Sequence, residues 1–378
     1  MNTPNTSSER ARFLAVVLLL ALPLLILTAS AGGGSGPLSG LTGAARVVAG
    51  MLGIIDAPRN DNEFEIQKLH LFRALCAAGV GGSLALAGAM AQGLFRNPMA
   101  DPGLLGIGSG AALGAILGIA ILGGYGPNWT PAAVSGSLGL VPLLSLAVAV
   151  IVALTVYRLS TRSGRISVSL LLLTGLAINS IIGALMAMLQ VFLIDDTRIA
   201  QAIMSWGFGT FDDRNAFHTG VIWSGAALAL AAIPFVGLEL DLLAGGETDA
   251  AGLGADPVRV KTIVLACIAL ATAAAVAFCG QIAFVGLLVP HIVRMICGPR
   301  HRALLPISFL TGAVLLVLIV VFQHNLCPHI ATSLRTHGHS GSARVFDRIV
   351  HLQPGVLTSL LGSPFFLILL MRQGRSLA

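Results

Sequence analysis

Long apolar runs alternate with short polar segments along almost the whole chain. An α-helix needs roughly 20 apolar residues to cross the hydrocarbon core of a bilayer, so each run is read as one crossing. The pattern predicts ten spans, near residues 13–31, 69–93, 103–124, 138–158, 167–193, 217–238, 259–280, 281–298, 303–323 and 354–371. The seventh and eighth runs are nearly continuous, and Cys279-Gly-Gln281 predicts the break between them. An even number of spans places both termini on the same side of the membrane.

Composition agrees with this pattern. Of the 378 residues, 56% are hydrophobic and only 10% are charged, and the mean hydropathy is +0.89. Soluble domains carry about 25% charged residues, and a soluble protein this apolar would expose large adhesive patches. We therefore expect an all-α polytopic membrane protein with a single transmembrane domain over residues 1–378. The net charge of +6 does not indicate nucleic-acid binding, because the basic residues lie in short loops between apolar runs.

The N-terminal segment permits two interpretations. Arg10 and Arg12 precede an apolar run from Phe13 to Thr28, and Ala29-Ser-Ala31 resembles a signal-peptidase site. The run is long for a signal peptide and suits a first spanning helix better. The cysteines carry less information, because their spacing includes no C-x-x-C pair and so indicates neither a disulfide framework nor a zinc site. They are Cys76, Cys267, Cys279, Cys297 and Cys327.

Basic residues orient the chain. With the N-terminus in the cytoplasm, the short cytoplasmic segments hold 13 of the 22 basic residues, as the positive-inside rule expects. They are Arg10, Arg12, Arg96, Arg158, Arg162, Arg165, Arg259, Lys261, Arg294, Arg300, Arg302, Arg372 and Arg375. The outward segments then include two long loops, at about 32–68 and 324–353. Loops of this size indicate either contact with an external partner or plain solvated connections.

Small residues recur along the second span. They form two adjacent rows at four-residue spacing, and such rows let helix backbones approach closely in lipid. We interpret both rows as packing faces without chemistry. They are Gly79, Ser83, Ala87 and Ala91, and beside them Gly81, Ala85, Ala89 and Gly93.

The charged residues constrain the energy source. None of the 16 acidic residues falls in the middle of a predicted span, where proton- or sodium-coupled carriers usually place a carboxylate. A sodium site built from backbone carbonyls would escape this argument. The chain also lacks a phosphate-binding loop, since its only lysines, Lys68 and Lys261, do not follow the required glycine. This subunit is therefore not the ATPase itself, and transport is either passive or driven by a separate subunit.

The longest predicted cytoplasmic loop, at about 239–258, offers a docking surface for such a subunit. Glu247-Thr-Asp-Ala-Ala251 predicts a short helix, which Gly252 and Gly254 would end. An ordinary surface loop is the alternative.

Three sequence blocks carry a resemblance to a known family. The first is Gln92-Gly-Leu-Phe-Arg-Asn-Pro-Met-Ala-Asp-Pro-Gly-Leu-Leu-Gly106, the second runs from Gly246 through Gly286-Leu-Leu-Val-Pro-His-Ile-Val-Arg294, and the third is Pro354-Gly-Val-Leu-Thr-Ser-Leu-Leu-Gly-Ser-Pro-Phe-Phe366. Together they resemble permease subunits of binding-protein-dependent ABC importers for iron chelates, heme and cobalamin (the FecCD/BtuC-type family). The residues that match the family motif are Arg96, Asn97, Pro98, Asp101, Pro102, Gly286, Pro290, His291 and Arg294.

The resemblance implies a type II ABC importer permease of about ten helices, without catalytic residues, cofactor or metal of its own. A second copy of the chain, two cytoplasmic ATPases and a periplasmic binding protein would complete the transporter in the inner membrane, with both termini cytoplasmic. The ATPases would dock on Gly246, Glu247, Thr248, Asp249, Ala250, Ala251, Gly252, Leu253 and Gly254. His291 and Arg294 would serve structural and coupling roles at a cytoplasmic helix end.

The resemblance also implies outer and central sites. His70, Arg73 and Arg344 would dock the binding protein, and His70 departs from the arginine that relatives carry, which would make docking pH-sensitive. The spans at 167–193 and 354–371 would line the pathway. The first contributes Asn179, Ser180, Met186, Met188 and Gln190, although both methionines also suit helix packing.

The substrate is less constrained. Leu176-Ala-Ile-Asn179 resembles heme permeases, and residues 323–340 carry His324, Cys327, His329, His337 and His339. Imidazole and thiolate groups can contact a heme iron, although a solvated polar insertion explains the segment as well. We favour heme, with ferric siderophores and cobalamin as alternatives. An ion-coupled secondary carrier and a passive channel remain the rival classes.

Overall fold

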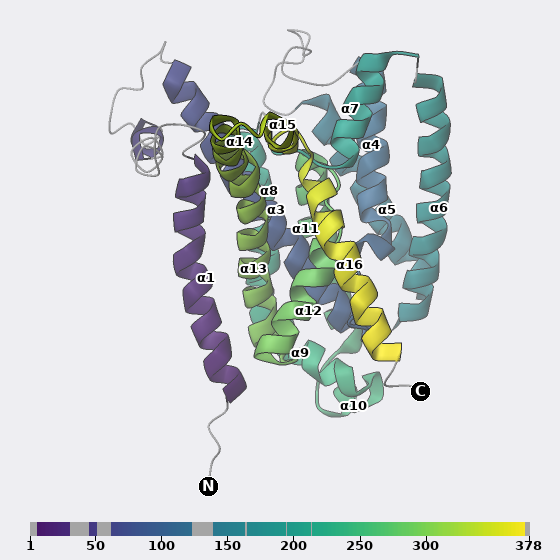
Figure 1. Ribbon diagram of the computed structural model, residues 1–378. Helices are drawn as coiled ribbons and strands as arrows, with labels where there is room; N and C mark the ends of the chain where they lie inside the picture. Colours follow the sequence, from purple (N-terminus) through teal and green to yellow (C-terminus); the bar gives the residue numbers. More distant parts are fainter. Residues whose placement is uncertain are drawn as a thin grey trace.

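The computed structural model describes residues 6–30, 45–50, 62–122, 139–162, 165–193, 195–212 and 214–374. It is a helical bundle (Figure 1). Its first half contains α1 (Thr6–Ser30), α3 (Asn62–Phe95), the 3-10 helix η1 (Pro102–Leu105), α4 (Ile107–Leu122), α5 (Leu140–Ser160), strands β1 (Thr161–Arg162) and β2 (Arg165–Ile166), and α6 (Val168–Leu193).

The second half continues with α7 (Thr197–Gly207), α8 (Ala216–Ala231), α9 (Ile233–Gly245), α10 (Glu247–Gly252), α11 (Pro257–Cys279), α12 (Val285–Cys297) and α13 (His301–Val321). The π-helix η2 (Phe322–Leu326), α14 (Cys327–Thr336), α15 (Ser340–Ile349) and α16 (Pro354–Gly374) follow. The two strands form one short antiparallel hairpin.

Helix α3 is the centre of the bundle. Every residue from 76 to 95 is buried, and α3 packs against α1, α8, α9, α11, α12 and α13. A helix that is surrounded by others must present small side chains on every face if the backbones are to approach closely. The two small-residue rows that the sequence predicts as packing faces are therefore confirmed as such.

The closest approach is between α3 and α12. A Cβ atom added to Gly88 would lie 1.8 Å from the carbonyl oxygen of Gly286, so neither residue has space for a side chain. A similar contact joins Gly81 to Gly312 of α13, where an added Cβ would lie 2.2 Å from the carbonyl oxygen. These contacts fix the positions of α12 and α13 against the central helix.

Several helices are broken or short. The predicted break at 279–281 is confirmed, because α11 ends at Cys279 and Gly280 has a positive φ of 76°. Phe284 then begins α12 with φ 66°, in the left-handed region that non-glycine residues rarely adopt. Helices α8 and α9 meet at an angle of 56°. Non-helical backbone at membrane depth is tolerated where protein buries it.

Each of the ten predicted spans coincides with a helix: α1, α3, α4, α5, α6, α8, α11, α12, α13 and α16. Among the described residues, five helices are long and apolar enough to cross a membrane, or up to seven if each bent pair counts as one span. Helices α4 and α12 are shorter and apolar. The start of α1 and the end of α16 lie at the same end of the bundle as α10 (Figure 1).

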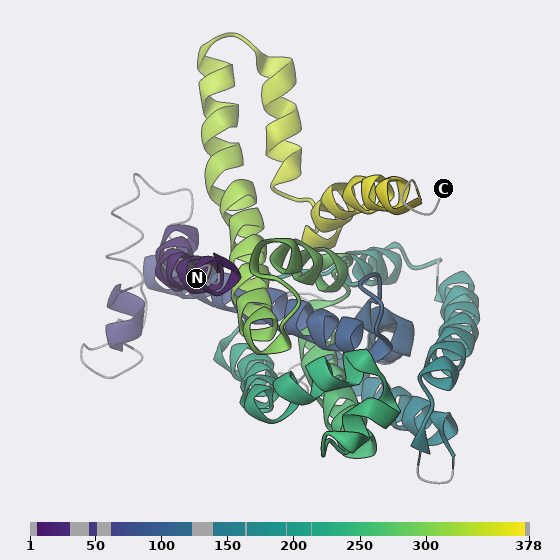
Figure 2. The same ribbon diagram turned by 90° about the horizontal axis from the view of Figure 1, so that it is seen from below.

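The segment at 324–353 differs from the predicted loop. It forms η2, α14 and α15, and the last two pair as an antiparallel hairpin that projects away from the body (Figure 2). Buried Gln323 fixes the base of the hairpin, because its Nε2 donates to the carbonyls of Ile349 and Leu352, at 3.3 and 2.7 Å. Of the other predicted loop, 32–68, most residues lie outside the described ranges, and residues 62–68 are the first two turns of α3.

Candidate functional site

Helix α10 forms the exposed tip of one end of the bundle (Figure 1). The short helix predicted at Glu247–Ala251 is confirmed and extends to Gly252. Gly246 precedes it with φ 134° and ψ 153°, a backbone conformation that is essentially restricted to glycine. Only Ala250 is buried, whereas Leu253 is 69% exposed. The remaining predicted docking residues, Thr248, Asp249, Ala251 and Gly254, are also exposed.

The helices beside α10 are held by polar contacts. Asp256 caps α11 by accepting from the backbone N–H groups of Val258 and Arg259, at 3.0 and 3.1 Å. The only buried lysine, Lys261, forms an ion pair with Glu247 of α10, with Nζ and Oε1 2.7 Å apart. This ion pair therefore stabilises the orientation of α10 relative to α11.

A second set of polar side chains connects α3, α9, α12 and α13. The Asp241 carboxylate contacts His301 at both the backbone nitrogen (3.0 Å) and Nδ1 (2.6 Å). Nearby, Arg294 donates to Oε1 of Gln92 at 3.3 Å, and the Gln92 amide donates to Leu287. The sequence indicated Arg294 but not Asp241 or His301, whose pairing depends on the tertiary arrangement.

The motif residue His291 is buried on α12. Its ring lies edge-on to Phe365 of α16, with centroids 6.2 Å apart. Pro290 is buried inside the same helix. The His291 ring therefore packs α12 against the last helix.

The motif after α3 builds a tight turn. Arg96 has φ 50°, Asn97 Oδ1 accepts from the Met99 N–H at 2.9 Å, and exposed Pro98 lies between them. Asp101 caps η1 by accepting from Gly103 at 2.7 Å, and Pro102 occupies its first position. Burial raises the pKa of Asp101, and the hydrogen bond from Gly103 partly opposes this. The turn directs η1 against α6.

A cavity of about 380 Å³ brings two predicted groups of residues together. It is lined by motif residues from the turn and from α12, and by Asn179 of the predicted pathway. Asn179 accepts from Ser109 at 2.5 Å and donates to the carbonyl of Gly103 at 3.1 Å. The polar residues that line the cavity are Asp101, Ser109, Asn179, Thr272 and Gln281.

The predicted pathway residues on α6 occupy different faces. Asn179 faces η1 and α4, and Met186 packs against the core. Ser180, Met188 and Gln190 are exposed. The large exposed side chains of α6 are apolar except for Gln190, and they include Leu173, Leu176, Ile181, Leu185, Val191 and Phe192.

Three segments converge where the backbone is irregular. The N–H of Gly355, at the start of α16, donates to Phe208, and the N–H of Thr210 donates to Cys279, each at 2.8 Å. On α16, Gly362 lies against Phe284, since an added Cβ would be 2.4 Å from that of Phe284. The broken helices therefore contact α16 directly.

At the opposite end from α10, Arg73 forms an ion pair with Asp212 at 2.7 Å. Both line a polar cavity of about 440 Å³ with His324 and His351. Half-buried His70 lies one turn before Arg73 on α3, whereas exposed Arg344 lies on α15 in the projecting hairpin. No described group of three or more His, Cys, Asp or Glu side chains is arranged to hold a metal ion.

The FecCD transport family matches residues 18–335, which is most of the chain. This chain belongs to the FecCD transport family.

Relatives of this FecCD chain include permeases for different substrates. The cobalamin import system permease BtuC of Halobacterium salinarum is 37% identical over 310 residues, covering 80% of this chain and 72% of that protein. The hemin transport system permease HmuU of Yersinia pestis is 37% identical over 306 residues, covering 81% and 82%. A solved structure described as an inward-facing metal-chelate type ABC transporter matches with a TM-score of 0.70, 25% identity and coverage of 96% and 99%.

The FecCD assignment defines the general role of the chain. It is a multi-pass membrane permease of the ABC importer class that handles iron chelates, heme or cobalamin. It is a translocation subunit, so ATP hydrolysis belongs to partner subunits in this family.

Proposed function

We propose that this permease imports heme across the bacterial inner membrane as a homodimer with two cytoplasmic ATPases and a periplasmic binding protein. In this assembly both termini and α10 lie in the cytoplasm. ATP-driven closure of the ATPases moves α10, and the bundle alternates between outward and inward access.

The exposed tip at residues 246–254 supports the ATPase contact. Docking surfaces combine an apolar centre with a polar rim. Leu253 offers an exposed apolar side chain, and Thr248 and Asp249 are exposed beside it. The tip is also rigidly attached, because the ion pair of Glu247 with Lys261 holds it to α11.

The exposed faces of α6 and α16 support the dimer and its central pathway. Both helices lie on the side of α3 that is opposite α1 in both views (Figures 1 and 2). Exposed apolar residues on α16 include Leu360, Leu361 and Leu367. A second copy that covers these faces would enclose a passage between the subunits.

The character of the α6 face carries the choice of heme. Its exposed side chains are Leu, Ile, Val, Phe, Met and Ala, with Ser169, Ser180 and Gln190 as the uncharged polar exceptions. Such a wall suits a flat apolar macrocycle that must pass without tight binding. Cobalamin, whose periphery is rich in amides, is the second candidate, because the BtuC relative from Halobacterium salinarum is as similar as HmuU.

Basic residues at the outer end support docking of an acidic surface of the binding protein. They are exposed Arg344 and the half-buried residues His70 and Arg73. Arg73 is engaged by Asp212, so an incoming carboxylate would compete with that ion pair. Rim charges of this kind mainly raise the association rate.

Growth of an iron-starved deletion strain tests the substrate. Parallel cultures receive heme or a ferric siderophore as the only iron source. Loss of growth on heme alone is the expected result. Loss of growth only on the siderophore, or growth on both with loss of cobalamin-dependent growth, would overturn the choice of heme.

A further inference from the structure

Lys261 is placed unusually for a charged side chain. It lies at the start of α11, it is only 4% exposed, and it is one of two lysines in the chain. A buried ammonium group is costly unless it is paired and hydrogen-bonded. Its two described partners lie on different elements, so the side chain joins parts of the molecule that are distant in sequence.

The first partner is on α10. Glu247 is the first residue of that helix, and its carboxylate lies 2.7 Å from Lys261 Nζ. Glu247 is 47% exposed, so the pair extends from the docking tip into the protein.

The second partner leads to the pathway helix. Lys261 Nζ donates at 2.8 Å to the carbonyl of buried Ile166, the last residue of β2. Ser167 follows as the cap of α6, because its hydroxyl accepts from the Leu170 N–H and its carbonyl from the Leu171 N–H. Only one residue therefore separates the Lys261 contact from the first turn of α6.

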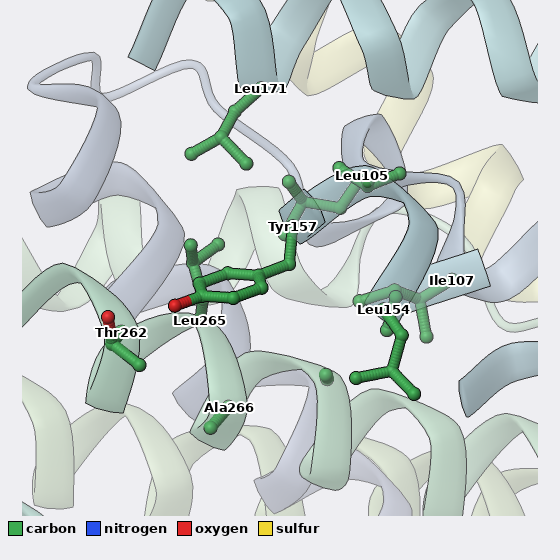
Figure 3. A pocket seen from close by; sticks show the side chains of 11 residues that line it. Leu105, Ile107, Leu154, Tyr157, Leu171, Thr262, Leu265 and Ala266 are labelled. Carbon is green, nitrogen blue, oxygen red and sulfur yellow. The ribbon is translucent and has the colours of Figure 1, made fainter. Parts of the chain in front are cut away.

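An apolar cavity lies one residue along α11 from Lys261. This cavity of about 200 Å³ lies between α5, α6 and α11, lined by Tyr157, Leu171, Thr262 and Leu265 among others (Figure 3). Tyr157 crosses it, and its hydroxyl points toward Thr262, the residue after Lys261 (Figure 3). A void of this size removes van der Waals contacts between the helices that line it. The polar contacts of Lys261 provide a direct connection from α10 to the start of α6.

We propose that Lys261 is a positioning residue that transmits movement of α10 to the pathway helix α6. It does so by binding Glu247 and the Ile166 carbonyl at the same time. The inference rests on the proposed function, in which an ATPase moves α10. Lys261 touches neither ATP nor substrate, and its effect is on the coupling between hydrolysis and transport.

The test uses the complete transporter in proteoliposomes, with heme delivered by its binding protein, and measures both uptake and ATP hydrolysis. Lys261→Met keeps the aliphatic stem and removes both contacts. We expect the ATPases to remain bound and to hydrolyse ATP, while uptake per ATP falls at least tenfold. Lys261→Arg retains donors for both partners and is expected to preserve uptake.

Two further variants make the test decisive. Lys68→Met applies the same change to the other lysine, which forms an exposed pair with Glu65 at the outer end of α3, and it should leave uptake per ATP unchanged. Glu247→Gln removes the charge of the partner from α10 while Lys261 stays bonded to Ile166, and it should lower uptake per ATP even if Lys261→Met fails to fold.

The outcomes separate the two proposals. Wild-type uptake per ATP in Glu247→Gln, or in a folded Lys261→Met, would overturn the role of Lys261 while leaving the importer intact. Failure of the unsubstituted chain to bind an ATPase or to accumulate heme with ATP would overturn the proposed function instead.

Discussion

At the residue scale, the packing of the bundle depends on glycines that have no space for a side chain. Gly88 is the sharpest case, because an added Cβ would lie 1.8 Å from a backbone oxygen of α12, which cannot move without moving the helix. We expect Gly88→Ala to destabilise the bundle by about 3 kcal/mol, the upper part of the usual overpacking range. Thermal unfolding in detergent measures this.

Gly183→Ala is the matched control for Gly88→Ala. Gly183 lies in α6 with nothing within 4 Å of an added Cβ, so the substitution should be neutral or slightly stabilising, since alanine favours helix. Equal stability of the two variants would contradict the close packing of α3 on α12.

The two small-residue rows that the sequence predicts include Gly81 but not Gly88, and they do not identify the partner of either residue. Four-residue spacing marks a packing face, whereas the choice of Gly286 or Gly312 as the contact depends on how distant helices cross. The same limit explains why the sequence indicated Arg294 but gave no indication of Asp241. Side-chain pairing across nonadjacent helices requires the tertiary arrangement.

At the element scale, α10 requires an unusual connection to α9. Gly246 adopts φ 134° and ψ 153°, and a side chain there costs about 1–3 kcal/mol of strain. Gly246→Ala should relieve this strain by reorienting α10, so we expect the ATPase activity that depends on the binding protein to fall about tenfold. Measurement of this ATPase activity in the reconstituted complex tests the prediction.

The neighbouring glycine provides the control. Gly245 is the last residue of α9, and an added Cβ there meets nothing within 4 Å. Gly245→Ala should keep normal stimulated hydrolysis. Loss of activity in both variants, or in neither, would show that the backbone at Gly246 does not orient α10.

The elements were predictable to different degrees. Apolar runs and glycine breaks predicted a helix at each of the ten expected spans and the short helix at 247–251, because these features are local. The hairpin of α14 and α15 was not predicted, because its polar and basic sequence is also typical of a solvated loop. Its helices are stabilised by contact with each other and by Gln323 at the base.

At the scale of the whole molecule, the proposed dimer places the exposed apolar faces of α6 and α16 against a second copy of the chain. All five cysteines are buried, so introduced cysteines can be labelled selectively. We expect a chain with Leu185→Cys on α6 and Leu360→Cys on α16 to form crosslinked dimers with a short bifunctional maleimide. Electrophoresis under denaturing conditions detects the product.

The control moves one cysteine to another surface. Leu228 of α8 is 61% exposed, and the pair Leu228→Cys with Leu360→Cys should remain monomeric on the gel. Dimers in this control, or none in the α6 and α16 pair, would contradict the proposed dimer.

The most direct test of the central claim is transport in proteoliposomes that contain the permease, its ATPase and a heme-loaded binding protein. We predict that heme accumulates only with ATP and that vanadate stops its accumulation, while an uncoupler has no effect. Accumulation that ignores ATP and vanadate but collapses with the uncoupler would contradict this prediction.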